Sequence, residues 1–201
     1  MKKLTPWDRI LLLLTGLLAA YQIMFGVVGL KKISLISYTI SFGVLLIAGL
    51  LIVMIGFEIL DSPSVVVIAS LIPLSFSGGL VAEHLPRFTG LYFTLAAVGF
   101  SAVVLTRLVQ SGKTGVYVLA LVHGISGLII LILPLYLSLT GQTPGRLMFV
   151  SAGGGLIGAG GLLLSFLKTG RPVLDQETLY SLLPGLLLLM TACFVVGLSA
   201  G

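Results

Sequence analysis

Residues 115–138 read GVYVLALVHGISGLIILILPLYLS and contain no Asp, Glu, Lys or Arg. A helix needs about 20 largely apolar residues to cross the hydrocarbon core of a bilayer, and this stretch is long enough. We therefore predict that residues 115–138 form a membrane-spanning helix. Similar stretches recur along the whole chain.

The composition extends this prediction to the entire protein. Hydrophobic residues make up 58% of the 201 residues and charged residues only 8%, whereas soluble domains carry roughly 25% charged residues. So few charges cannot cover a surface that faces water. We predict an all-α polytopic bundle of about seven transmembrane helices, forming one domain over residues 1–201.

Short segments typical of turns separate the apolar stretches, for example Lys31-Lys32 and Asp61-Ser62-Pro63. The predicted spans are residues 9–30, 36–60, 64–82, 88–110, 115–138, 146–167 and 177–200. Pro73 and Pro184 fall inside the third and seventh spans, where each removes a backbone hydrogen bond and favours a kink.

The basic residues predict the orientation, because cytoplasmic loops are enriched in Lys and Arg. With a cytoplasmic N-terminus, seven basic residues lie inside and four outside. The inner set is Lys2, Lys3, Arg9, Arg107, Lys113, Lys168 and Arg171, and the outer set is Lys31, Lys32, Arg87 and Arg146. We expect a multi-pass protein of a prokaryotic cytoplasmic membrane with the C-terminus outside, and no nucleic-acid partner.

An internal repeat is one interpretation of three matching helices. A leucine and a glycine recur together at an interval of 56 residues, as Leu35 with Gly43, Leu91 with Gly99 and Leu147 with Gly155. This pattern predicts one leading helix followed by three parallel two-helix units. The alternative is chance similarity within a restricted alphabet of Leu, Gly and Val.

Small residues predict how the helices pack, because apolar faces do not drive association in lipid and close approach depends on small side chains. In the sixth span, Gly154, Gly158 and Gly161 share one face, and we predict that this helix lies centrally. In the fifth span, one face carries Ala120, His123, Gly124 and Gly127. We predict that this face is buried in the bundle.

His123 is the main candidate for a functional residue, because ionisable side chains inside a membrane are usually functional. It could bind haem, contact a quinone or relay protons; the alternative is a neutral imidazole bonded to a neighbouring helix. A haem bound by both histidines is disfavoured, because His84 and His123 are predicted in opposite halves of a membrane core about 30 Å thick. We expect no cofactor, with haem at His123 as the alternative.

Two further groups are weighed against structural roles. Glu83, His84 and Arg87 form an outer cluster that could bind a cation or handle protons, or simply be a solvated loop. Glu58 and Asp61 could attract a metal, but Asp61 is better interpreted as the cap of the third span. We expect no metal site.

Arg107 is interpreted as a side chain that reaches the headgroups from one turn inside the membrane. The sequence SGKTG at residues 111–115 lacks the preceding glycine of a phosphate-binding loop, since that position is Arg107. Asp175 and Glu177 place negative charge at the start of the seventh span, where the helix dipole favours it.

Three classes of function remain. The first is a non-enzymatic accessory subunit that packs in a larger membrane complex, with other membrane proteins or further copies of itself as partners. The second is a small transporter or channel with a site near His123, and the third is a redox or lipid-modifying protein. We place them in that order and do not expect an enzyme.

Overall fold

The computed structural model describes residues 3–26, 29–109, 113–168 and 173–199, and these residues form helices and short connections without any strand. Seven helical segments in this part of the chain are long and apolar enough to cross a membrane. The prediction of an all-α bundle with about seven spans is confirmed.

The helices lie close to the predicted positions. The seven spans are α1 (Pro6–Phe25), α2 (Lys32–Ile55), α3 and α4 together (Pro63–Ala69 and Leu71–His84), α5 (Thr89–Val104), α6 (Lys113–Leu139), α7 (Met148–Lys168) and α8 (Gln176–Leu198). The short helical segments η1 (Phe57–Asp61), η2 (Pro86–Phe88), η3 (Leu105–Val109) and η4 (Gly145–Leu147) adjoin them.

The first helix is shorter than predicted. A capping box between Thr5 and Asp8 begins α1, and the helix ends at Phe25 instead of near residue 30. Gly26, which follows, has a φ of 57°. A residue with positive φ ends a helix, and glycine adopts that conformation at little cost.

The third span is broken at Ser70, three residues before Pro73. Proline has no N–H to donate to the carbonyl one turn earlier, and its ring crowds that carbonyl. The kink predicted at Pro73 is therefore present as a break between α3 and α4. In contrast, α8 continues through Pro184, and α6 continues through Pro134.

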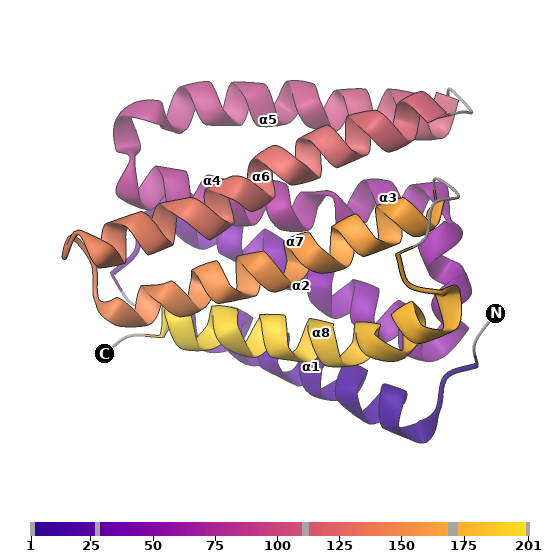
Figure 1. Ribbon diagram of the computed structural model, residues 1–201. Coiled ribbons are helices and arrows are strands. Elements are labelled where there is room, and N and C mark those ends of the chain that lie inside the picture. The colour runs from indigo at the N-terminus through magenta and orange to yellow at the C-terminus, as the bar shows by residue number, and fades with distance from the viewer. Residues whose placement is uncertain (1–2, 27–28, 110–112, 169–172, 200–201) are drawn as a thin grey trace.

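The two ends of the bundle are named here by the chain termini, which lie at opposite ends (Figure 1). The N-side carries the N-terminus, η1 and the start of α6, and the C-side carries η2, η4 and the end of α8. Helices α1, α2, α4, α6, α7 and α8 contact one another in a closed ring in that order, and α5 packs outside the ring on α4 and α6.

The most buried span is the third, which contains α4, whereas the prediction placed the sixth span centrally. In the third span 67% of the most apolar window is buried, against 28% in the sixth and 6% in the fourth, which contains α5. Gly78 and Gly79 explain the position of α4. A Cβ at Gly79 would lie 2.6 Å from the ring of Tyr38, and one at Gly78 would lie 3.1 Å from the ring of Phe93.

The core lies between α2, α4 and α8. The ring centroid of Phe76 on α4 is 4.2 Å from that of Phe194 on α8 and 5.2 Å from that of Tyr38 on α2. Aromatic pairs at such separations add favourable ring contacts to their burial. A second stack joins Phe57 of η1 to Tyr180 of α8 at the N-side, with centroids 5.0 Å apart.

The three glycines of the predicted repeat have different surroundings. A Cβ at Gly99 would meet Val122 at 3.2 Å, within the same two-helix unit, and one at Gly155 would meet Leu131 of the preceding unit. A Cβ at Gly43 would meet nothing within 4 Å. The repeat therefore stays a prediction that helix packing does not support.

Candidate functional site

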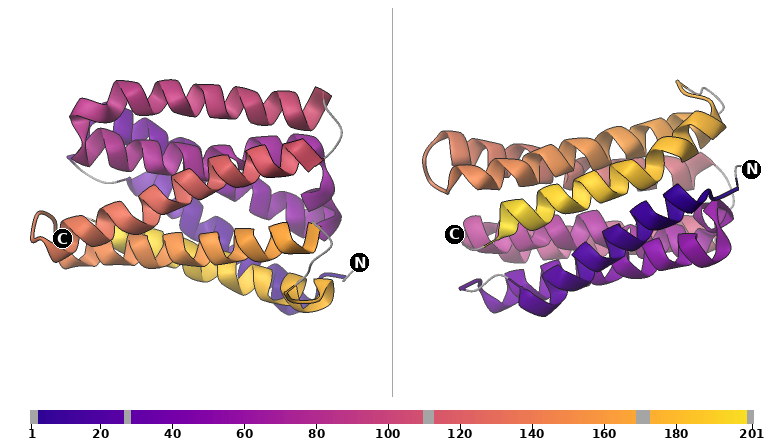
Figure 2. Two further views of the ribbon diagram at one scale, coloured as in Figure 1. Left: turned by 45° about the horizontal axis from the view of Figure 1, so that its top comes forward. Right: turned by 90° about the horizontal axis from the view of Figure 1, so that it is seen from below.

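Helix α6 leans across the bundle and leaves a space on each side. At the N-side it lies beside the end of α5 and apart from α7, whereas at the C-side it lies beside α7 and apart from α5 (Figures 1 and 2). Two hollows border α6 accordingly: one is lined in part by α6 and α7 at the N-side, and the other is lined mainly by α5 and α6 at the C-side.

The C-side contact between α6 and α7 depends on Gly154. A Cβ at this position would lie 2.8 Å from Cγ2 of Ile130 and 3.1 Å from the backbone nitrogen of Leu131. Only a residue without a side chain lets the two backbones approach so closely. This contact closes the gap between α6 and α7 beyond the N-side space.

The N-side space is a cavity of about 160 Å³, called here the N-side cavity. Its walls come from η1, α3, η3, α6 and α7. The lining residues are Leu60, Val65, Val66, Ala69, Arg107, Val116, Leu119, Ala120, His123, Gly161 and Leu164. Nine of the eleven are apolar, so the chemistry of the cavity depends on Arg107 and His123.

A π-helical turn, η3, carries Arg107. Such turns re-aim side chains and occur frequently at functional sites. A Cβ at Gly115 of α6 would lie 2.9 Å from the carbonyl oxygen of Thr106 and 3.3 Å from Cδ of Arg107. The glycine thus lets η3 and α6 approach closely with the arginine side chain beside them.

Arg107 does not only reach toward the headgroups, as its position in the sequence had suggested. The side chain is half-buried, lines the N-side cavity, and its Nε atom is buried without a hydrogen-bond partner among the described residues. The π-turn places the side chain beside α6, close to Gly115.

His123 lies on the wall of the same cavity, ten residues after the start of α6. This is roughly 15 Å along the helix at 1.5 Å per residue, which is well inside a membrane core about 30 Å thick. Its buried Nδ1 has no hydrogen-bond partner among the described residues.

The prediction that the His123 face is buried in the bundle is wrong. His123 and Gly127 are half-buried, and Ala120 and Gly124 are exposed. Because α6 leans away from α7 at the N-side, this face borders the cavity and the bilayer. The hydrogen bond to a neighbouring helix that would satisfy a structural histidine is not found in the described residues.

Unsatisfied polar atoms concentrate at this cavity. Four buried side-chain nitrogen or oxygen atoms lack a hydrogen-bond partner among the described residues, and two of them are Arg107 Nε and His123 Nδ1. No Asp or Glu of the described structure forms an ion pair with Arg107. Within the described residues, the guanidinium at this cavity therefore has no ion-pair partner.

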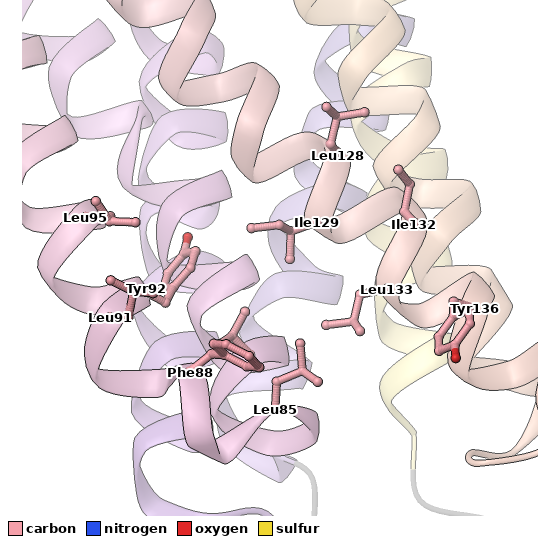
Figure 3. Close-up of a pocket in the computed structure, with 11 residues that line it drawn as sticks. Leu85, Phe88, Leu91, Tyr92, Leu95, Leu128, Ile129, Ile132, Leu133 and Tyr136 are labelled. Atoms are coloured by element: carbon pink, nitrogen blue, oxygen red, sulfur yellow. The ribbon is translucent and has the colours of Figure 1, made fainter.

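The C-side space is larger and chemically simpler. This C-side groove has a volume of about 450 Å³ and is lined by Val81, Leu85, Phe88, Leu91, Tyr92, Leu95, Leu128, Ile129, Ile132, Leu133 and Tyr136. Figure 3 shows side chains of α5 and α6 facing each other across the gap. The hydroxyl of Tyr92 donates to the carbonyl of Leu74 at 2.8 Å and is also bonded to Ser77, so it is satisfied.

The predicted outer cluster is organised by a residue that sequence reasoning did not select. The backbone N–H of Lys31 donates to Oε2 of Glu83 at 3.1 Å, and Nζ of Lys31 donates to the carbonyls of Ala82 and Glu83 at 3.2 and 2.7 Å. These bonds fasten the connection between α1 and α2 to the end of α4. His84 is half-buried beside them, and Arg87 is exposed in η2 without an ion pair to Glu83 in the described structure.

Glu58 and Asp61 both lie in η1 at the N-side. Glu58 is exposed in η1 and lies beside Lys3 and Arg9 along a surface pocket. The N-cap of α3 is Ser62, so the prediction that Asp61 occupies this position is wrong by one residue. Proline at N1 fixes the start of the helix there.

Asp175 is the N-cap of α8, as its position predicted. Its carboxylate accepts hydrogen bonds from the backbone N–H of Thr178 at 2.6 Å and from the Thr178 hydroxyl at 2.8 Å. These bonds stabilise the charged form and hold the pKa of Asp175 below its usual value. Glu177 lies exposed in the first turn of α8.

The glycines selected for packing differ in what surrounds them. Gly154 contacts α6 closely, but a Cβ at Gly158, Gly161, Gly124 or Gly127 would meet no atom within 4 Å. The predicted face of Gly154, Gly158 and Gly161 therefore serves close packing only at its C-side end. Gly153 supplies another close approach of α7, where a Cβ would lie 2.6 Å from the ring of Phe194.

The described residues contain no group of three or more His, Cys, Asp or Glu arranged to hold a metal ion. His84 ends α4 at the C-side, and His123 lies in the N-side part of α6, so the two histidines belong to different sites. A cavity of about 160 Å³ is also smaller than the roughly 300–1,000 Å³ of pockets that enclose drug-sized ligands or cofactors.

Comparisons of the chain with protein-family models, curated proteins and solved structures found no significant match. The sequence pointed to His123 as a candidate but did not predict that Arg107 lines the same cavity. The available signal was the spacing of Arg107 and Gly115 on either side of a short connection, which brings a cation close to the start of α6.

Proposed function

We propose that the protein is a small membrane transporter that binds an anionic ligand in the N-side cavity. One observation carries this proposal: Arg107 and His123 share an otherwise apolar cavity, and each has a buried nitrogen without a partner among the described residues. Buried polar atoms in proteins are normally hydrogen-bonded. Ionisable groups inside a membrane usually mark a ligand or ion pathway.

The two side chains have complementary roles in binding an anion. The guanidinium of Arg107 keeps its charge and presents several N–H donors in a planar fork, which suits the paired oxygens of a carboxylate or phosphate. His123 offers a ring nitrogen that can donate to the same ligand. Its proton can also be exchanged, so binding would respond to pH.

The shape of the α6–α7 gap supports access from one side at a time. Secondary transporters bind their ligand near the middle of the membrane and alternate between states open to either side. The N-side cavity is open between α6 and α7, and the Gly154 contact closes the C-side of the same helix pair. Because α6 borders both spaces, its tilting would close one and open the other.

The basic residues support a cytoplasmic N-side. Among the described residues, five basic residues lie at or near helix ends on that side and four lie at the C-side. The N-side set is Lys3, Arg9, Arg107, Lys113 and Lys168, and the C-side set is Lys31, Lys32, Arg87 and Arg146. The N-side cavity would then face the cytoplasmic leaflet, in a multi-pass protein with its C-terminus outside.

The proposal can be tested with purified protein in vesicles of zwitterionic lipid. Three probes cover the main kinds of anion: radiolabelled inorganic phosphate, radiolabelled acetate, and a fluorescent phosphatidylglycerol whose movement between leaflets is followed by dithionite quenching. We expect the protein to accelerate the movement of at least one probe. We also expect Arg107→Gln to slow it about tenfold, because hydrogen bonds to charged groups are among the strongest in proteins.

Arg87→Gln is the matched control, because it removes one positive charge from the exposed C-side. We expect this variant to stay within about twofold of the original rate, since exposed charges contribute little. Transport is contradicted if no probe moves faster than in protein-free vesicles. A specific role for Arg107 is contradicted if both variants slow transport equally.

An accessory subunit of a membrane complex is the second candidate, favoured by the exposed small residues Ala120 and Gly124 on α6. Small residues on a lipid-facing helix allow another membrane helix to approach. This candidate predicts that the protein co-purifies with a membrane partner at native expression levels, and that Gly124→Leu removes the partner. Isolation of the protein alone, with transport activity, contradicts it.

A further inference from the structure

The ligand of the N-side cavity can be described more closely, and this inference rests on the proposed function. The first constraint is charge. Arg107 is permanently protonated, and no carboxylate in the described structure pairs with it. Isolated charges inside a membrane are unfavourable. A ligand with a single negative charge neutralises the site, whereas a cation would add a second positive charge.

The second constraint is the lining. Only two of the eleven lining side chains are polar. A small mineral anion is strongly hydrated, and two donors replace only part of its water shell. An anionic group attached to an apolar chain offsets part of this cost, because its chain can stay in contact with apolar side chains and lipid.

The third constraint is the size and the opening of the cavity. A volume of about 160 Å³ holds a headgroup but not a long chain. Ala120 on α6 and Gly161 on α7 are exposed lining residues, so the cavity opens between these helices. Both residues lie inside membrane spans. The opening therefore faces lipid, and a chain can leave the cavity through it.

We infer that the ligand is a monoanionic amphiphile that enters laterally from the N-side leaflet. Its carboxylate or phosphodiester group would contact Arg107 and His123, and its apolar chain would lie in the opening between α6 and α7. Fatty acids and anionic phospholipids share this chemistry, and the experiment below separates them.

The chain contains only two histidines, His84 and His123, which makes nitrogen NMR of the imidazoles a direct test. Protein labelled with ¹⁵N-histidine is placed in nanodiscs of phosphatidylcholine, and His84→Gln assigns the signals. Phosphatidylglycerol and oleate are then added separately. We expect at least one of them to shift the His123 signals, while those of His84 stay in place as the internal reference at the C-side.

Two pairs of variants test whether binding depends on Arg107 and on the opening beside Ala120. Arg107→Gln should weaken the binding of the amphiphile about tenfold, and Arg87→Gln should leave it within about twofold. Ala120→Phe fills the opening and should also weaken binding, whereas Ala97→Phe places the same bulk on the exposed face of α5, outside both cavities, and should not.

The possible failures can be told apart with inorganic phosphate and acetate as further probes. If one of these shifts His123 and neither amphiphile does, the cavity binds an anion and the lipid-like ligand is wrong. If no probe shifts His123, the anion site of the proposed function is wrong as well. Equal effects of Ala120→Phe and Ala97→Phe would overturn lateral entry.

Discussion

The N-side cavity and the C-side groove both border α6, and they differ in size and in the polar atoms along their walls. The groove is the larger, at about 450 Å³ against about 160 Å³. Its walls are apolar, and the hydroxyl of Tyr92 is satisfied within the protein. The smaller cavity contains the two unsatisfied nitrogens of Arg107 and His123.

This difference is the reason for placing the proposed function in the smaller space. Lipid chains can fill an apolar groove that opens to the bilayer without any specific recognition. A half-buried arginine whose buried nitrogen has no partner among the described residues is different, because its partial desolvation is unfavourable and must be offset by stabilisation elsewhere or by a ligand. Function is therefore better sought where polar atoms are unsatisfied than where space is largest.

The largest expected effect is on stability, through the close contact between α6 and α7 at Gly154. Gly154→Val should lower the free energy of unfolding by about 2–3 kcal/mol, because the new side chain would meet the backbone of α6. Gly158→Val, on the same helix one turn later, should change it by less than about 1 kcal/mol, because the space there is open. Denaturation in SDS titrations measures both values.

Equal destabilisation by the two valine substitutions would contradict the view that α6 and α7 touch closely only toward the C-side. A second measurement sharpens the test. If Gly154→Val opens the C-side of the gap, a maleimide probe should react faster with a cysteine introduced at Ile130, in a Cys193→Ser background, than it does with Gly154 in place.

A smaller effect on stability should distinguish Tyr92 of the C-side groove from Arg107 of the N-side cavity. Tyr92→Phe removes the satisfied hydroxyl of the groove and should lower the free energy of unfolding by about 1 kcal/mol. Arg107→Met removes a half-buried cation whose Nε has no partner among the described residues, so it should leave the stability unchanged or raise it while abolishing ligand binding. Thermal unfolding in detergent without added lipid measures both changes.

Loss of stability in Arg107→Met comparable to that in Tyr92→Phe would show that the arginine is satisfied in the ligand-free protein. The contrast between the two spaces would then disappear. Arg107→Lys is an informative companion, because it keeps the charge but loses the planar fork and should bind the ligand less tightly than the original protein.

Hydropathy predicted the fold because lipid imposes a length and an apolar composition on every spanning helix. It could not predict which helix is central. The glycines of α7 are more numerous, but burial depends on which partners face a small residue, and α4 has the rings of Tyr38 and Phe93 against Gly79 and Gly78. Composition contains no information about those partners.

The candidate site was only half predicted for a similar reason. His123 stands out because a titratable residue interrupts an apolar span. Arg107 lies near a helix end, where basic residues are common, and its true direction depends on the π-turn of η3 and on the close approach of Gly115. The lean of α6, which creates the cavity, follows from contacts at both of its ends and has no local sequence pattern.

The smallest expected effect tests whether the N-side cavity depends on the neighbouring helix cap. The pKa of Asp175 is lowered by its hydrogen bonds to Thr178, so the charged carboxylate stabilises the folded state above the usual pKa of about 4, and this stabilisation is lost as the pH falls through the lowered value. The thermal midpoint of Asp175→Asn should therefore lie slightly below that of the original protein at neutral pH, and the two midpoints should converge as the pH falls below the lowered pKa.

If the lean of α6 alone shapes the cavity, the His123 signals and their response to phosphatidylglycerol should be the same in this variant. A changed response would mean that the connection from α7 to α8 helps to hold the cavity open, and the difference between the two spaces would then have a second cause.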